Sequence, residues 1–312
     1  MHPRRVIFAA ALAILSVAGA LHADDDAPSA EPKLTVAWWN LRNYLLEPVR
    51  DEEGRTLTPA KTPESIASIV ETVAGIKPDI LALAEVGTRR DLIDLQRRLK
   101  QAGVDLPHAE WVDGADQHRH LALLSRFPVE AGHDTTSAVN SGGLPRRVQR
   151  GFLDCKVAVH PDFTLRVLGA HLKSPRVVPE FDQDEQRRGE SLLLRQRVVS
   201  ILSQDPGTPL LLVGDLNDAK NSPAVAGLTG RRGTPTALTI LPLTDRGGDA
   251  WTYHWAENDT YTRVDYMMAS NALRRLFDHG DSRIPRERDW MKASDHRPLV
   301  AVFKLSATSR KP

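Results

Sequence analysis

Cysteine is nearly absent from this chain, since Cys155 is the only one among 312 residues. An intramolecular disulfide is therefore excluded, and the fold must be stabilised by its hydrophobic core, with or without a bound metal. A zinc centre is also disfavoured, because such centres need several Cys or His residues at short spacing. No cysteine stands near the end of the apolar N-terminal run, so a lipoprotein anchor has no residue to which it could attach.

An excess of charge of either sign is missing as well. The chain has 41 Lys and Arg residues against 40 Asp and Glu residues, a formal net charge of +1. Bulk charge argues neither for nor against a nucleic-acid partner, although most of the cations are Arg, which suits bidentate contact with phosphate. With 41% hydrophobic and 26% charged residues, the composition is that of a soluble globular protein with one large α/β domain or two small ones.

Long hydrophobic runs are limited to Val6–Leu21. Two arginines precede this run and small residues end it, which is typical of a secretory signal peptide over residues 1–23, cleaved after Ala20 or Ala23. An uncleaved anchor is the alternative, because the run is at the lower limit for spanning a bilayer. Cleavage would change the formal net charge from +1 to −1, leave no stable membrane anchor and give a secreted or periplasmic protein.

The remainder of the chain predicts one folded domain. Residues 24–32 are polar and rich in Pro and Ala, so we expect a flexible leader, then a domain over 33–305 and a tail over 306–312. Apolar residues at helical spacing predict helices over 62–77, from Thr88 onward and over 184–203. Apolar β-type runs predict strands at 34–39, 80–84, 121–125, 152–159, 163–170, 210–213, 262–268 and 299–304. Residues 47–61 and 219–255 are expected to be mostly loop, and the whole pattern indicates an α/β fold.

Polar residues gather where these predicted strands end. Asp215 and Asn217 directly follow a buried run and, being two apart, can point to the same side of an extended backbone. An ordinary Asx turn explains this pair equally well. The complete set comprises Asn40, Glu85, His171, Asp215, Asn217, Asp265, Asp295 and His296. Carboxylates of this kind suit a hard cation such as Mg²⁺ or Mn²⁺, which together with a general base can attack a phosphate ester.

The motifs around these residues resemble those of the endonuclease/exonuclease/phosphatase superfamily, whose members are similar to deoxyribonuclease I. The resemblance covers about residues 33–305 and depends on the order of the motifs, because each one alone is weak. In chain order, the motifs are Trp39-Asn40-Leu41-Arg42, Ala84-Glu85-Val86, Leu123-Leu124-Ser125-Arg126, Gly169-Ala170-His171-Leu172, Gly214-Asp215-Leu216-Asn217, Arg263-Val264-Asp265-Tyr266 and Ser294-Asp295-His296.

This resemblance implies a four-layer α/β/β/α sandwich, in which two mostly antiparallel sheets pack face to face between helices. It also implies one or two ions of Mg²⁺ or Mn²⁺, with Glu85 as the principal ligand and with Asn40 and Asp295 in support. The other implied roles are catalytic: His296, oriented by Asp265, binds the scissile phosphate, Asp215 handles the attacking water, Asn217 stabilises the pentavalent phosphorus, and His171 contacts a phosphate oxygen. Whether the general base is Asp215 or the His296–Asp265 pair stays open at this point.

Candidate substrate-binding residues come from basic segments between the strands. Arg119 and His120 lie in a polar stretch that either lines a pocket or is an exposed loop. Three arginines in a glycine-containing loop and a lysine after the His171 motif are further candidates for phosphate contacts or for a solvated surface: Arg146, Arg147, Arg150 and Lys173.

We therefore expect a secreted metal-dependent phosphoesterase, a monomer with no protein partner, that hydrolyses phosphodiester bonds by in-line attack of water. A nuclease acting on nucleic acid is the preferred interpretation. The alternatives are a phosphatase or sphingomyelinase-like phospholipase of the same fold, and an inactive phosphate-binding module. The alternation of Trp251, Tyr253 and Trp255 is compatible with a membrane-facing hairpin and equally with a strand packed on the core.

Overall fold

The computed structural model of the protein describes residues 32–286 and 290–305. The predicted signal peptide, the leader up to Glu31 and the tail over 306–312 lie outside these residues. Within the described part of the chain, no helix is both long and apolar enough to cross a membrane.

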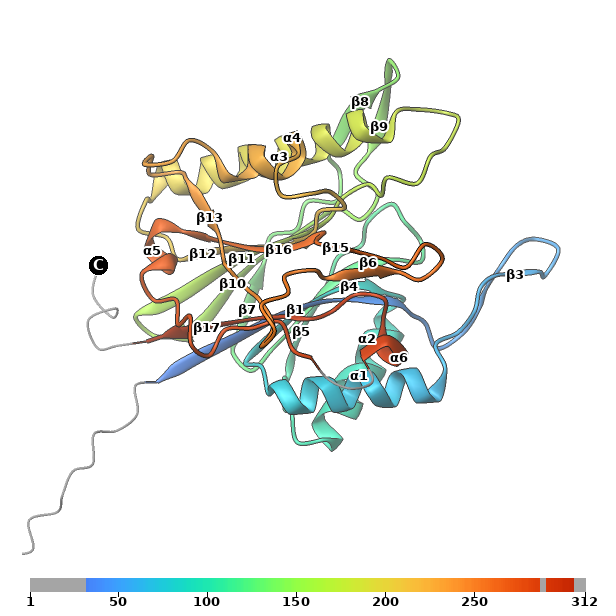
Figure 1. The fold of residues 1–312 in the computed structure, drawn as a ribbon, viewed down its shortest axis with the longest axis horizontal. Coiled ribbons are helices and arrows are strands. Elements are labelled where there is room, and N and C mark those ends of the chain that lie inside the picture. Colours follow the sequence, from blue (N-terminus) through green and yellow to red (C-terminus); the bar gives the residue numbers. More distant parts are fainter. Residues whose placement is uncertain (1–31, 287–289, 306–312) are drawn as a thin grey trace, which may run out of the picture. The chain divides into compact units, whose positions relative to one another are not determined.

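Two large sheets form the centre of the domain (Figure 1). The first has the strand order β17-β1-β4-β6-β5, and the second has the order β13-β16-β12-β11-β10-β7. The strands of the first sheet are β1 (Lys33–Tyr44), β4 (Ile80–Val86), β5 (His108–Trp111), β6 (His120–Ser125) and β17 (Leu299–Lys304). Those of the second are β7 (Val129–Ala131), β10 (Phe152–His160), β11 (Phe163–His171), β12 (Leu210–Asp215), β13 (Leu238–Ile240) and β16 (Asp265–Ser270).

Six helices and three short hairpins complete the described elements. The hairpins pair β2 (Val49–Arg50) with β3 (Thr56–Thr58), β8 (Ala138–Ser141) with β9 (Leu144–Arg147), and β14 (Tyr253–Trp255) with β15 (Thr260–Thr262). The helices are α1 (Pro63–Ile76), α2 (Arg89–Gln101), α3 (Gln183–Gln204), α4 (Pro223–Thr229), α5 (Asn271–Arg274) and α6 (Trp290–Ala293). The stretches expected to be loop at 47–61 and 219–255 thus contain short elements.

Three hydrophobic clusters define the layers. The central cluster lies between the sheets and takes alternate residues of β1, such as Val36 and Trp38, together with Val167 of β11 and Val213 of β12. A second cluster joins the outer face of the first sheet to α1 and α2, and a third joins the outer face of the second sheet to α3 and α4. The predicted α/β/β/α sandwich is therefore confirmed, and Figure 1 shows the two pairs of helices on opposite sides of the sheets.

Local sequence signals explain where the predicted helices begin. Thr62 caps α1 by accepting a hydrogen bond from the main-chain N–H of Ser65, and Pro63 occupies the first turn, where its missing N–H costs nothing. Thr88 and Asp91 form the expected capping box of α2. The helix predicted over 184–203 is observed as Gln183–Gln204.

One parallel pair of strands lies within each sheet among the described strands. Helix α1 connects β1 to its parallel neighbour β4, and α3 connects β11 to its parallel neighbour β12. All other neighbours in the two sheets are antiparallel. Ligands of α/β proteins commonly bind at the carboxyl ends of parallel strands. The topology therefore singles out the ends of β1, β4, β11 and β12.

The second sheet is tied to α3 by a buried carboxylate. Asp154 on β10 is 3% exposed and accepts hydrogen bonds from Arg166 of β11 and Arg197 of α3, with distances of 2.6 to 2.9 Å. We expect Asp154→Ala to lower the free energy of unfolding by about 3 kcal/mol, because it leaves two guanidinium groups without their buried partner. Urea denaturation measures this change.

Glu130→Ala provides the matched control, since Glu130 pairs with Lys156 of the same strand β10 at the surface. We expect this variant to lose less than about 1 kcal/mol. Equal effects of the two substitutions would contradict a stabilising role for the buried cluster.

Candidate active site

Four polar side chains meet where the parallel strands end. Asn40 and Glu85 come from the first sheet, and His171 and Asp215 come from the second. The amide nitrogen of Asn40 donates to Glu85 Oε1 at 3.3 Å and to Asp215 Oδ2 at 3.0 Å, so one side chain joins both sheets. His171 Nε2 lies 3.5 Å from Asp215 Oδ2 and 3.9 Å from Glu85 Oε1. The structure thus brings these four candidates into one cluster, in which Asn40, His171 and Asp215 are buried and Glu85 is partly exposed.

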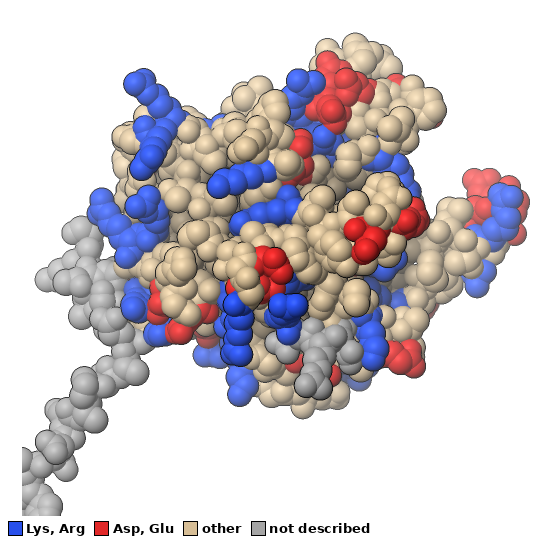
Figure 2. Space-filling view, in the orientation of Figure 1, with Lys and Arg blue, Asp and Glu red and all other residues tan. Residues whose placement is uncertain are grey.

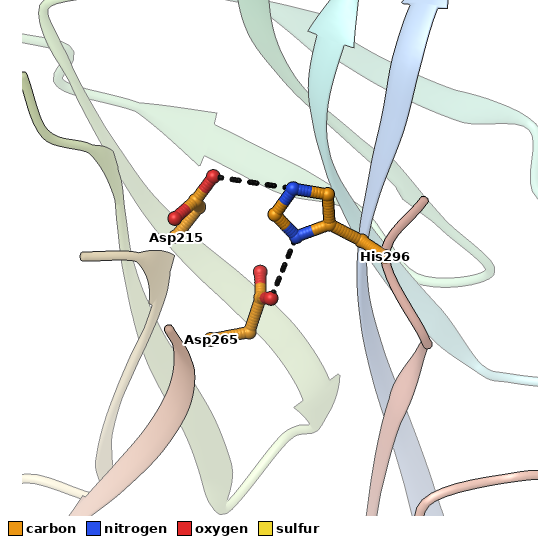
Figure 3. A group of neighbouring side chains, drawn as sticks. All are labelled: Asp215, Asp265 and His296. Atoms are coloured by element: carbon orange, nitrogen blue, oxygen red, sulfur yellow. Dashed lines mark hydrogen bonds and ion pairs between the residues drawn. The ribbon is translucent and has the colours of Figure 1, made fainter. Parts of the chain in front are cut away.

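A histidine–aspartate pair lies next to this cluster (Figure 3). His296 Nδ1 is 2.8 Å from Asp265 Oδ2, and His296 Nε2 is 3.8 Å from Asp215 Oδ2. The second oxygen of Asp265 accepts a hydrogen bond of 2.8 Å from the indole of Trp38. The indole of Trp39 donates to the main-chain oxygen of His296, also at 2.8 Å. These contacts fix both the ring and the backbone of His296.

Burial and neighbouring charges shift the pKa values of residues in the histidine–aspartate pair and in the four-residue cluster. Burial raises the pKa of Asp215, and the negative charge of Asp265 raises it further. Burial lowers the pKa of His296, but the charges of Asp265 and Asp215 outweigh burial and raise it overall. Burial lowers the pKa of His171 well below its usual value, reinforced by the positive charges of Arg150 and His296. At neutral pH, His296 is therefore an imidazolium and His171 a neutral imidazole.

The residues expected to hold a metal lie at the first-sheet side of the site. Glu85 adopts a left-handed backbone conformation with φ of 59°, and its Oε2 accepts a hydrogen bond from the main-chain N–H of Asn43. Asp295 Oδ2 lies 3.4 Å from Arg42 Nε, and Asp295 Oδ1 lies 4.0 Å from His296 Nε2. Ser294, which directly precedes Asp295, donates its hydroxyl to the main-chain oxygen of Asn40.

A hard divalent cation fits the chemistry of these donors. Carboxylates and an amide oxygen are ligands that Mg²⁺ and Mn²⁺ prefer. Asp215, Asp265 and His296 also lie close enough to form a three-residue ligand set, with candidate atoms within 4.8 Å of one another. In that set, however, His296 is an imidazolium, which has no lone pair for a metal. We therefore favour Asn40, Glu85 and Asp295.

Asn217 lies beside Asp215, as its position in the sequence requires. Its main-chain N–H donates to Asp215 Oδ1 at 3.0 Å, and its side-chain nitrogen donates to the main-chain oxygen of Leu172 at 3.0 Å. Asn217 has φ of 52°. One amide hydrogen thus fixes the side chain, and the second is the one that could donate to an oxyanion.

Three of the six substrate-binding candidates surround the cluster. Arg119 Nε lies 3.9 Å from Glu85 Oε2, and Arg150 Nε lies 3.3 Å from Asp116 Oδ2. Lys173 follows the end of β11, and its charge helps to lower the pKa of the buried His171, after burial itself and the charge of Arg150. These three cations form a partial rim around the buried acidic residues.

The other three candidates contact residues outside the cluster. On the β8–β9 hairpin, Arg146 stacks over the ring of Phe181, and Arg147 donates to the main-chain oxygen of Thr135. His120 is neither in a pocket-lining loop nor in an exposed one: it begins β6 and is 3% exposed. Its Nδ1 is 2.8 Å from the Gly87 oxygen, and its ring packs on Trp111, so its role is structural.

The sequence of this chain matches that of a known family over most of its length. The profile of the endonuclease/exonuclease/phosphatase family matches residues 37–296, which include every residue of the four-residue cluster. The chain belongs to this family. Members of the endonuclease/exonuclease/phosphatase family are metal-dependent hydrolases of phosphate esters. Among curated proteins, no sequence matches the chain significantly.

Solved structures of the endonuclease/exonuclease/phosphatase family share the fold at low sequence identity. Truncated TDP2 from Caenorhabditis elegans is 20% identical, with a TM-score of 0.59 over 87% of this chain and 97% of that chain. The human nocturnin catalytic domain with bound sulfate is 18% identical, with a TM-score of 0.58 over 88% and 95%. A family protein from Bacteroides vulgatus is 15% identical, with a TM-score of 0.60 over 88% and 100%.

Two residues of this family site were missed in the sequence. Trp38 and Thr252 contact Asp265, the first through its indole and the second by accepting the main-chain N–H of Asp265 at 3.0 Å. Trp38 belongs to a predicted strand, where a tryptophan is ordinarily part of the core, and Thr252 lies in a stretch that was expected to be loop. Nothing in the local sequence indicates that Trp38 is more than a core residue or that Thr252 is more than a loop residue.

Glu85→Gln tests the assignment of the metal ligands. We expect the affinity of the metal-free protein for Mn²⁺ to fall on the order of tenfold or more, because the variant keeps the shape of the side chain but loses its charge. Titration followed by electron paramagnetic resonance measures this affinity directly. Glu71→Gln, on the exposed face of α1, is the control and should bind Mn²⁺ like the wild type. An unchanged affinity in Glu85→Gln would exclude Glu85 as a ligand.

Proposed function

We propose that this protein is a metal-dependent phosphodiesterase that acts on nucleic acid by in-line attack of water. The observation that carries this proposal is the placement of His296 between two aspartates, 2.8 Å from Asp265 and 3.8 Å from Asp215, beside Glu85 and Asn40. In this arrangement the His296 imidazolium and the Asp215 carboxylate lie side by side. Asp265 keeps the proton on His296, so the carboxylate of Asp215 can act as a base.

The histidine–aspartate pair and Asp215 have distinct parts in this reaction. His296, protonated and held by Asp265, donates a hydrogen bond from Nε2 to an oxygen of the scissile phosphate. Asp215 accepts the proton of the attacking water, because its raised pKa makes it a stronger base than an ordinary carboxylate. This assignment favours Asp215 over the His296–Asp265 pair as the general base, since an imidazolium has no free site for a proton.

The remaining groups bind and orient the phosphate. Asn217 donates its second amide hydrogen to the charge that develops on phosphorus-bound oxygen. His171, as a neutral imidazole, contacts a phosphate oxygen from the second-sheet side. A Mg²⁺ or Mn²⁺ ion held by Glu85, Asn40 and Asp295 would neutralise phosphate charge and act as a Lewis acid.

Nucleic acid is the preferred substrate because a local group of cations lies around the site. Arg119, Arg150 and Lys173 lie around the cluster, and Arg146 and Arg147 extend this set onto the β8–β9 hairpin. On the face in Figure 2, Lys and Arg side chains alternate with acidic ones and form no single continuous patch. Backbone phosphates on either side of the scissile bond would contact such a local group of cations.

A phospholipid or sphingomyelin substrate is the second candidate, and the β14–β15 hairpin favours it. Trp255 is 44% exposed and Tyr261 is 49% exposed, while Tyr253 of the same hairpin lies with its ring centroid 4.8 Å from that of His296. Exposed aromatic residues beside a site are typical of membrane-interface binding.

A substrate panel separates these functions. Linear and supercoiled DNA, RNA, inositol phosphates and sphingomyelin are incubated with the protein with and without EDTA. We expect cleavage of DNA or RNA that EDTA abolishes, and a loss of at least about a hundredfold in His296→Ala and in Asp215→Asn, which remove general acid–base and electrostatic catalysis. His279→Ala, at an exposed position, is the control.

The other results of the panel each contradict part of the proposal. Cleavage of sphingomyelin or inositol phosphates alone would exclude nucleic acid as the substrate. A protein that binds Mn²⁺ but cleaves none of the panel would be an inactive phosphate-binding module. Activity of Asp215→Asn within about tenfold of the wild type would exclude Asp215 as the base.

We also propose that the protein is exported by its N-terminal residues 1–23 and acts as a monomer in the periplasm or outside the cell. The basic start, the apolar run and the small residues that end it support export. The full-length gene, expressed in a secreting bacterial host, should yield a mature N-terminus at Leu21 or Asp24, as read by N-terminal sequencing. Recovery of intact Met1 from the membrane fraction would indicate the uncleaved anchor instead.

A further inference from the structure

Strand β1 is irregular after Asn40, where two successive residues with left-handed backbones form a turn within the strand. Arg42 has φ of 47° and Asn43 has φ of 57°, although neither is glycine. The register between β1 and β4 shifts between Asn40 and Tyr44, where this turn lies. A left-handed conformation costs a non-glycine residue free energy and persists only where the surroundings hold it.

Lys61 holds this turn from the next segment of the chain. Its ammonium donates to the main-chain oxygen of Leu41 at 2.7 Å and to that of Arg42 at 3.0 Å. Its own main-chain N–H donates to the oxygen of Leu45 at 2.7 Å, which fixes Lys61 at the base of the β2–β3 hairpin. One side chain thus binds two consecutive carbonyl groups of the strained turn.

The other ends of the same two peptide groups contact the expected metal ligands. The peptide that begins with the Leu41 carbonyl ends with the N–H of Arg42, which donates to Asn40 Oδ1 at 3.0 Å. The peptide that begins with the Arg42 carbonyl ends with the N–H of Asn43, which donates to Glu85 Oε2 at 3.0 Å. Because each peptide group is planar, fixing its carbonyl also fixes the direction of its N–H.

We propose that Lys61 is a positioning residue for the metal site: through two peptide groups it orients the oxygen atoms of Asn40 and Glu85. This inference rests on the metal-dependent activity proposed above. Lys61 donates to each carbonyl while that peptide donates to a ligand oxygen, so the hydrogen bonds form two short chains whose members polarise one another. Outer groups that orient ligands in this way commonly change metal affinity by about tenfold or more.

A direct contact with substrate is the competing role. Lys61 also lines a pocket of about 320 Å³ together with Arg42 and Lys292, and an anionic part of the substrate could enter it. The two roles differ in what they change: a positioning residue alters the affinity for metal without substrate, whereas a substrate contact alters KM at saturating metal.

The test uses three variants of the full domain. Lys61→Met keeps the length of the side chain but removes its donors, and Lys61→Met combined with Asn43→Gly places glycine where the left-handed backbone costs it nothing. Lys100→Met, at an exposed position paired with Asp105, is the matched control. Mn²⁺ affinity of the metal-free protein is measured by electron paramagnetic resonance, and kcat and KM are measured across a range of Mg²⁺ concentrations.

We expect Lys61→Met to bind Mn²⁺ about tenfold more weakly than the wild type, with KM at saturating Mg²⁺ unchanged. The added Asn43→Gly should restore part of the affinity, because the turn then no longer needs the ammonium to keep its shape. Thermal unfolding in EDTA reports whether each variant is folded, and the double variant provides the comparison if Lys61→Met alone is unstable. The control should match the wild type throughout.

Two results would overturn the inference. Wild-type Mn²⁺ affinity in Lys61→Met with a raised KM would make Lys61 a substrate contact, and a loss of affinity that glycine at position 43 does not restore would exclude positioning through the turn. A wild-type protein that binds Mn²⁺ but cleaves no phosphate ester would contradict the proposed function, while the Mn²⁺ titrations would still decide the role of Lys61.

Discussion

The site depends on the electrostatic repulsion between two buried carboxylates, which hydrogen bonds from the rest of the fold must offset. Asp215 and Asp265 lie directly opposite each other on the antiparallel strands β12 and β16, and their exposed fractions are 2% and 0%. Like charges at such positions destabilise a sheet, and burial in a dry interior increases the cost. The structure balances it with donors from the first sheet and from the segment before β17: the His296 ring and the Trp38 indole for Asp265, and the Asn40 amide for Asp215. Burial and the neighbouring negative charge raise the pKa of Asp215, and the charges of both aspartates keep His296 protonated, so the stability problem and the proposed chemistry have one physical origin.

The topology explains why these groups can meet. Each sheet contributes one parallel pair with a helical connection, and the four carboxyl ends of these strands come together across the gap between the sheets. Asn40 and Glu85 therefore approach from one sheet, while His171 and Asp215 approach from the other. This is why a fold of mostly antiparallel strands still has a binding site of the kind usual in parallel α/β proteins.

The sequence predicted those parts of the molecule that depend on local chemistry. The caps at Thr62 and Thr88, the buried run before Asp215 and the polar residues at strand ends are all visible within a few residues of chain. The pairing of Asp265 with His296 came only from the resemblance to a family, because 31 residues separate the two and no local pattern joins them. Lys61 could not be predicted, since its partners are main-chain carbonyls, which are the same in every sequence. The prediction of a loop at His120 was wrong for a related reason. Its polar neighbours in the sequence indicated a loop, whereas its ring packs on Trp111, a contact between strands that exists only in the folded sheet.

Trp38 has a consequence for how this protein can evolve. Its side chain belongs to the cluster between the sheets, yet its indole nitrogen belongs to the active site of the opposite sheet. The spacing of the sheets thus sets the length of a functional hydrogen bond, and any residue that sets this spacing acts on Asp265 at a distance. Apolar positions between the sheets therefore have to meet two requirements, packing and alignment. Substitutions there that the fold tolerates thermodynamically can still be rejected, because they move one half of the site against the other.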